Sequence, residues 1–124
     1  MRTITRAFVH CTASECGTVD EIRRWHLQRG WTDIGYHWVI LNQFQQYSNY
    51  KDCIADSKTD GLVQAGRPEE RPGSHVATAN FDSLGVVLVG NEAFSQRQVD
   101  SLIKVLVTKC QQYQIHPERI RGHS

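Results

Sequence analysis

The stretch LGVVLVG at residues 84–90 is the most apolar run of the sequence, and it predicts a central strand buried on both faces. Two further segments are typical of strands, because they are rich in β-branched and aromatic residues: AFVHC at residues 7–11 and YHWVILNQF at residues 36–44. GLVQAG at residues 61–66 is expected to pair with the second of these as a hairpin. RIRGHS at residues 119–124 indicates the start of a last strand or loop.

Two amphipathic helices complete the pattern. Thr18 is followed three residues later by Glu21, which is the spacing of a capping box, and Gly30 supplies a stop, so we predict a helix over residues 18–29. Ser95 begins a second capping box, after which apolar residues repeat at helical spacing as far as residue 113. The order β-α-β-β-β-α-(β) predicts a single-domain α/β fold in which helices flank a mixed central β-sheet.

The remaining segments are polar connections. Residues 45–60 form an insert that is longer than the usual hairpin connection, so we expect it to cross the surface. Residues 67–82 contain two prolines and Gly73 and are predicted to be a loop.

Length and charge exclude several classes of protein. A chain of 124 residues fits one domain, and a net charge of +1 argues against nucleic acid held mainly by bulk charge. Hydrophobic residues at 40% exclude an intrinsically disordered chain. The sequence has no apolar run long enough for a membrane span and no apolar core of a signal peptide. We therefore expect synthesis in the cytoplasm, a monomer, and no membrane or nucleic-acid partner.

The four cysteines have irregular spacings and form no CxxC pair. Reduced thiols are the expectation for a chain of this size, and a bridge between Cys16 and Cys53 remains an alternative.

Two of the six histidines stand at the ends of strand-like segments. His10 ends the first predicted strand and His123 follows the last apolar segment, so the two side chains could converge at one edge of the sheet. Neutral imidazoles there would suit zinc, although spacing alone also fits histidines with a purely structural role.

The other histidines have simpler interpretations. His26 is expected to be partly exposed on its helix, and His116 to lie in a turn before Pro117. Tyr36 and His37 are neighbours on a strand, so only one of them can face a given cleft.

Four segments together resemble one family. They are FVHCTAS at residues 8–14, EIRRWHLQRGWTDIGYHWVI at 21–40, VQAGRPEERPGSHVATANFDSLGVVLVG at 63–90, and RIRGHS. In this order they closely resemble the type 2 N-acetylmuramoyl-L-alanine amidases, the family of phage lysozyme-type amidases and peptidoglycan recognition proteins. The resemblance runs from about residue 7 to the last residue and is interrupted mainly by the insert.

The resemblance implies a zinc enzyme that degrades the bacterial cell wall, as endolysins do. His10 and His123 match two zinc ligands, and Tyr36 matches the tyrosine beside the zinc-bound water. The substrate groove would include His75 and Asn80, to which we add Arg67. The implied reaction is hydrolysis of the amide bond between N-acetylmuramic acid and L-alanine in peptidoglycan or muropeptides.

The sequence departs from the family pattern at its end. The family takes a third ligand, Cys or Asp, from a segment after the second histidine, with a catalytic Lys or Thr two residues before it, whereas this sequence stops at Ser124. We therefore expect an amidase domain over residues 1–124 that is truncated at its C-terminal end. Cys11 should not substitute, because it neighbours His10 and is expected on the opposite face of the strand.

Two alternatives to a zinc amidase are open at this point. The first is a peptidoglycan-binding module that keeps the groove and has lost the chemistry. The second is a thiol hydrolase that uses Cys11, which is disfavoured because Cys11 is expected to be buried in its strand.

Overall fold

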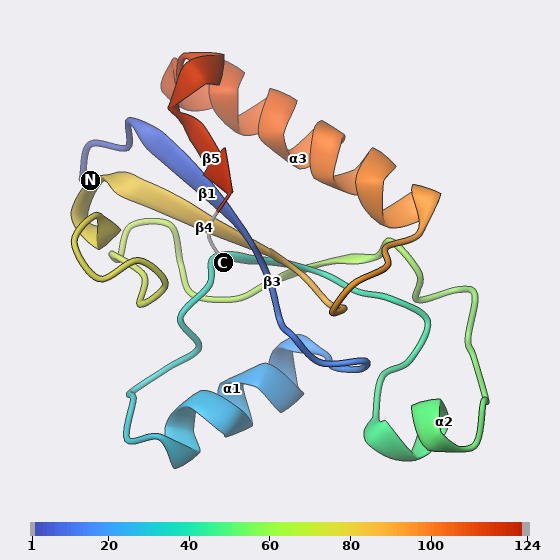
Figure 1. Cartoon of the computed structure of the whole chain (residues 1–124). Helices are drawn as coiled ribbons and strands as arrows, with labels where there is room; N and C mark the ends of the chain where they lie inside the picture. Colours follow the sequence, from blue (N-terminus) through green and yellow to red (C-terminus); the bar gives the residue numbers. More distant parts are fainter. Residues whose placement is uncertain (1, 123–124) are drawn as a thin grey trace.

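The computed structural model describes residues 2–122, which form a five-stranded sheet with the order β3-β2-β4-β1-β5. The strands are β1 (Arg6–Cys11), β2 (Trp38–Ile40), β3 (Val63–Ala65), β4 (Ser83–Leu88) and β5 (Ile120–Gly122). The helices are α1 (Val19–Gln28), α2 (Tyr47–Lys51) and α3 (Gln96–Tyr113). Figure 1 shows α1 and α3 on opposite sides of the sheet. The predicted fold class is confirmed.

The sheet is built around β4. This strand pairs in parallel with both β1 and β2, while β5 pairs in parallel with β1, and β3 pairs antiparallel to β2. All six residues of β4 are buried. Val87 packs in the core on the α1 side, and Val86 and Leu88 pack in the core that includes residues of α3. Burial on both faces explains why this segment is a continuous apolar run.

Both long helices begin at the capping residues that were predicted from the sequence. The Thr18 hydroxyl accepts a hydrogen bond from the backbone N–H of Glu21, and Gly30 follows α1 with a φ of +90°. Ser95 and Gln98 form the complete reciprocal capping box of α3. These caps satisfy backbone N–H groups that have no partner inside the helix.

The structure shortens one predicted element and adds another. Of the strand expected over residues 36–44, only β2 forms a regular strand. The hairpin continues beyond it through backbone hydrogen bonds between Leu41 and residues 61 and 62. The insert at residues 45–60 contains the short helix α2, which buries no residue. Near the end of the insert, Thr59 is buried and donates from Oγ1 to the carbonyl of Asn42 at 2.9 Å.

All four cysteines lie within residues 2–122 and are free thiols, as expected, and the Cys16–Cys53 bridge is not formed. In the described part of the chain, every helix is too short or too polar to cross a membrane.

Candidate functional site

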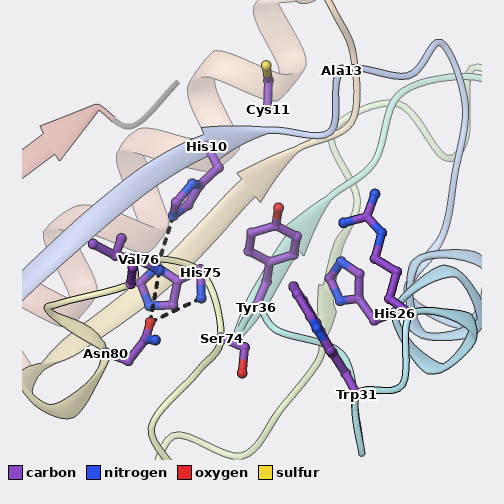
Figure 2. A pocket seen from close by; sticks show the side chains of 12 residues that line it. His10, Cys11, Ala13, His26, Trp31, Tyr36, Ser74, His75, Val76 and Asn80 are labelled. Atoms are coloured by element: carbon purple, nitrogen blue, oxygen red, sulfur yellow. Dashed lines mark hydrogen bonds between the residues drawn. The ribbon is translucent and has the colours of Figure 1, made fainter.

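A cavity of about 700 Å³ lies beside the end of β1 and the end of α1. Its walls come from β1, the end of α1, the segment between α1 and β2, and the loop before β4 (Figure 2). The lining residues are His10, Cys11, Ala13, His26, Arg29, Trp31, Tyr36, Ser74, His75, Val76, Ala77 and Asn80. Four of the predicted site residues therefore meet here, although they are distant in sequence.

His10 projects from β1 into the cavity and is only 6% exposed. Its Nε2 atom lies 2.9 Å from Nδ1 of His75, and its ring centroid lies 5.3 Å from that of Tyr36. Cys11 extends from the other side of β1, as predicted. The expectation that Cys11 is buried is wrong: it is exposed, because β1 ends there.

Asn80 stabilises the conformation of the loop before β4. The side-chain Oδ1 of Asn80 accepts hydrogen bonds from the backbone N–H groups of His75, at 3.0 Å, and Val76, at 2.9 Å. The His75 ring packs closely against two glycines. A Cβ atom added at Gly73 would lie 2.6 Å from the ring, and one added at Gly85 would lie 2.7 Å from it. Any side chain at these glycines would displace the histidine.

Tyr36 stands between His10 and His26 (Figure 2). Burial raises the pKa of its hydroxyl, so this group stays protonated at neutral pH. A protonated phenol can donate a hydrogen bond to a developing negative charge in the cavity.

His26 is a cavity residue that the sequence analysis missed. It is buried, not partly exposed as expected, because Trp31 and Tyr36 pack against its ring. The Gly35 N–H donates to its Nδ1 at 2.9 Å, and its ring centroid lies 4.4 Å from that of Trp31. Burial, with smaller contributions from Arg29 and Arg67, lowers the pKa of His26 to about 4, so the ring is neutral at pH 7. Only the resemblance of the surrounding segment could have drawn attention to it.

His37 lies outside the cavity, which confirms that only one of Tyr36 and His37 faces it. The His37 side chain is 1% exposed; Nδ1 accepts from the Gly85 N–H at 3.0 Å, and Nε2 lies 2.8 Å from the Arg71 carbonyl. His116 is exposed in a turn, as predicted.

Arg67 is not among the residues that line the cavity. Its guanidinium donates to the carbonyls of Ile34 at 2.9 Å and Pro72 at 2.7 Å. It therefore braces the loop that carries His75, and a direct contact with substrate would require it to release these carbonyls.

The donor type at His10 suits zinc, which binds neutral imidazole nitrogen. Among residues 2–122, however, no group of three or more His, Cys, Asp or Glu side chains is placed to hold a metal ion. The second predicted ligand, His123, lies outside the described residues. The last described residue, Gly122, pairs in register with Val9, the residue before His10.

Comparison with known proteins identifies the family. The family model for N-acetylmuramoyl-L-alanine amidase matches residues 1–124. The endolysin of Escherichia phage T7 is 37% identical over 118 residues, which cover 86% of this chain and 67% of the relative. The endolysin of Enterobacteria phage T3 is 38% identical over the same shares of the two chains.

Solved structures agree with this result. The N-acetylmuramoyl-L-alanine amidase LysC from Clostridium intestinale has a TM-score of 0.77 and 28% identity, and the match covers 98% of this chain and 71% of that one. Drosophila PGRP-LB shares the fold, with a TM-score of 0.75 at 21% identity over 99% of this chain and 71% of that one. The chain therefore belongs to the N-acetylmuramoyl-L-alanine amidase family of peptidoglycan-degrading enzymes.

Proposed function

We propose that this chain hydrolyses the amide bond between N-acetylmuramic acid and L-alanine in the bacterial cell wall, with a zinc ion held by His10 and His123. The observation that carries the proposal is the cavity in which His10, Tyr36 and His75 converge from three separate segments. The family supplies the reaction class, and these side chains are of the types that amide hydrolysis needs.

The strand pairing supports the two proposed zinc ligands. β1 and β5 run in parallel with Val9 opposite Gly122, and in the sequence His10 follows Val9 and His123 follows Gly122. When bound, zinc polarises a carbonyl oxygen and lowers the pKa of a water ligand from 15.7 to about 7. Catalytic zinc normally takes three protein ligands, and the family takes the third, Cys or Asp, from a segment that follows the second histidine.

Tyr36 is proposed as the catalytic hydrogen-bond donor. Its raised pKa keeps the hydroxyl protonated, and its ring is packed between His10 and His26. A donor fixed in this way can stabilise the oxyanion without reorganising, an effect for which loss of one donor typically costs about 10²–10³ in rate.

The loop of His75 and Asn80 is proposed as one wall of the substrate groove. Asn80 acts through its hydrogen bonds to the loop backbone, and Arg67 supports the same loop from outside the cavity. Trp31 is the exposed aromatic residue of the opposite wall. A muropeptide fits this proposal, because one protein of the same fold, a tyrosine-to-phenylalanine mutant of Drosophila PGRP-LB, has been solved in complex with tracheal cytotoxin.

The proposal is tested by incubating the zinc-loaded chain with purified peptidoglycan and analysing the soluble products by mass spectrometry. Amidase activity releases stem peptides that begin with a free L-alanine amino group. His10→Ala is expected to abolish this release, and His116→Ala, at an exposed position remote from the cavity, serves as the matched control. Sedimentation with peptidoglycan without release of peptides would instead favour the binding module.

A further inference from the structure

The two ring nitrogens of His75 face different partners. Nδ1 lies 2.9 Å from Nε2 of His10 inside the cavity, and Nε2 lies 3.3 Å from the hydroxyl oxygen of Ser83. Ser83 is the first residue of β4 and is fully buried. Its hydroxyl is also 2.6 Å from the carbonyl oxygen of Ala79.

Counting protons assigns the direction of these hydrogen bonds. The Ala79 carbonyl can only accept, and it is the nearer partner, so the single hydroxyl proton of Ser83 is donated to it. The Ser83 oxygen is then left to accept, and the donor is the Nε2–H of His75. A neutral imidazole has one N–H, so Nδ1 of His75 carries a lone pair and accepts from Nε2–H of His10.

The ring of His75 is also fixed in place by backbone. The close approaches come from Gly73 in the loop itself and from Gly85 in β4, and both are short enough that a Cβ atom would collide with the ring. Packing therefore fixes where the ring lies, while Ser83 determines which nitrogen carries the proton.

We infer that Ser83 is a positioning residue of the hydrolase site, which holds His75 in the Nε2–H form so that its Nδ1 lone pair faces the cavity beside His10. As a role in that site, this inference rests on the proposed function. A metal ion bound at Nε2 of His10 would require this nitrogen to be deprotonated, with the ring proton on Nδ1, and Nε2 would then no longer donate to His75. The Nδ1 acceptor of His75 is then directed at the N–H or O–H donors of a substrate, of which a peptide amide and a sugar hydroxyl are the two classes present in a muropeptide.

The tautomer is measured on the metal-free, ¹⁵N-labelled full chain by long-range ¹H–¹⁵N correlation of the histidine rings. The experiment is run at pH 8, where an ordinary imidazole is neutral. In the parent, His75 is expected to show one protonated Nε2 and one unprotonated Nδ1. In Ser83→Ala the two nitrogen shifts are expected to move toward each other, as in a mixture of tautomers, while the signals of His26 stay in place.

Two variants complete the experiment. Ser101→Ala is the matched control, because its hydroxyl donates to the Gly61 carbonyl, in the hairpin connection outside the cavity. Ser83→Thr keeps the hydroxyl and is expected to restore the parental shifts if the additional methyl group is accommodated. Thermal melts check that each variant is folded.

The inference is overturned if His75 in the parent carries its proton on Nδ1, or if Ser83→Ala leaves both nitrogen shifts unchanged. Because the measurement needs no turnover, its outcome is separate from that of the peptidoglycan assay. A parent with the expected tautomer that releases no stem peptide would refute the proposed function alone.

Discussion

His37 should make the stability of this protein depend on pH between 6.5 and 4. The side chain is 1% exposed and receives the Gly85 N–H at Nδ1, while Nε2 faces the Arg71 carbonyl. Burial, with a smaller effect from Arg2, lowers the pKa of His37 from 6.5 to about 4. The folded protein therefore holds this ring neutral at pH values where the unfolded chain protonates it.

The sign and size of the effect follow from proton linkage. Between pH 6.5 and 4 the unfolded chain binds a proton that the folded protein does not, so the stabilisation is complete above 6.5 and is lost as the pH falls toward 4. The difference between the two pKa values corresponds to about 3 kcal/mol in the free energy of unfolding. His26, whose pKa also falls to about 4, acts in the same direction.

The assay is urea unfolding at a series of pH values from 7 to 4, for the parent and His37→Gln. Glutamine can accept from the Gly85 N–H and donate to the Arg71 carbonyl but does not titrate. The variant is therefore expected to lose about 3 kcal/mol less than the parent on acidification.

For two reasons, the difference between the parent and His37→Gln reports on the titration of His37. The lowered pKa values of Asp33, Glu69 and Asp82 also stabilise the folded protein, and this contribution is lost only as the pH falls through their folded pKa values. Both proteins carry the same three carboxylates, so most of this loss cancels in the difference. His116→Gln, at an exposed position, is the control and should follow the parent. Equal losses in the parent and His37→Gln would refute the claim that His37 is held neutral by burial.

Four further outcomes are expected. Tyr36→Phe should keep the fold and bound zinc but lower kcat by about 10²–10³, measured as release of stem peptides; full activity would remove Tyr36 from the mechanism. His10→Ala should lose stoichiometric zinc in metal analysis of the purified protein, and unchanged zinc would contradict its role as a ligand. Gly85→Ala should destabilise the fold by about 1–3 kcal/mol in urea unfolding, because its methyl group would lie 2.7 Å from the His75 ring; parental stability would show that the ring can move away. Replacing residues 46–55, which are exposed apart from one half-buried side chain, with a Gly-Ser linker should leave a cooperative melt, whose loss would show that the insert belongs to the core.

The elements of the fold were predictable where one local pattern determines them. The continuous apolar run of β4 indicated burial on both faces, and the caps at Thr18 and Ser95 located the starts of both long helices. The end of β2 was not predictable, because the apolar run of the sequence continues past Ile40 to Leu41. Leu41 still pairs across the hairpin, but outside the regular strand. The short helix α2 has no buried face, so it leaves no hydrophobic periodicity in the sequence.

The candidate site was predictable only through the resemblance to a family. Strand-end position singled out His10, but nothing in the spacing of the sequence relates it to Tyr36 or to the loop of His75. The role of Arg67 in the substrate groove stays a prediction: Arg67 is not among the residues that line the cavity, and its guanidinium donates to the backbone carbonyls of Ile34 and Pro72.

The histidines show why sequence alone cannot separate structural from chemical roles. His26 and His37 each accept a backbone N–H at Nδ1, and the donors, Gly35 and Gly85, come from other segments of the chain. A ring held in this way is neutral, and one of its nitrogens is hydrogen-bonded to the backbone. Such a ring stabilises the structure around the site. His10 instead directs a ring nitrogen at another histidine inside the cavity, where a metal ion or substrate can compete for it. The partner of each nitrogen thus decides the role of the residue, and that partner is set by the tertiary fold.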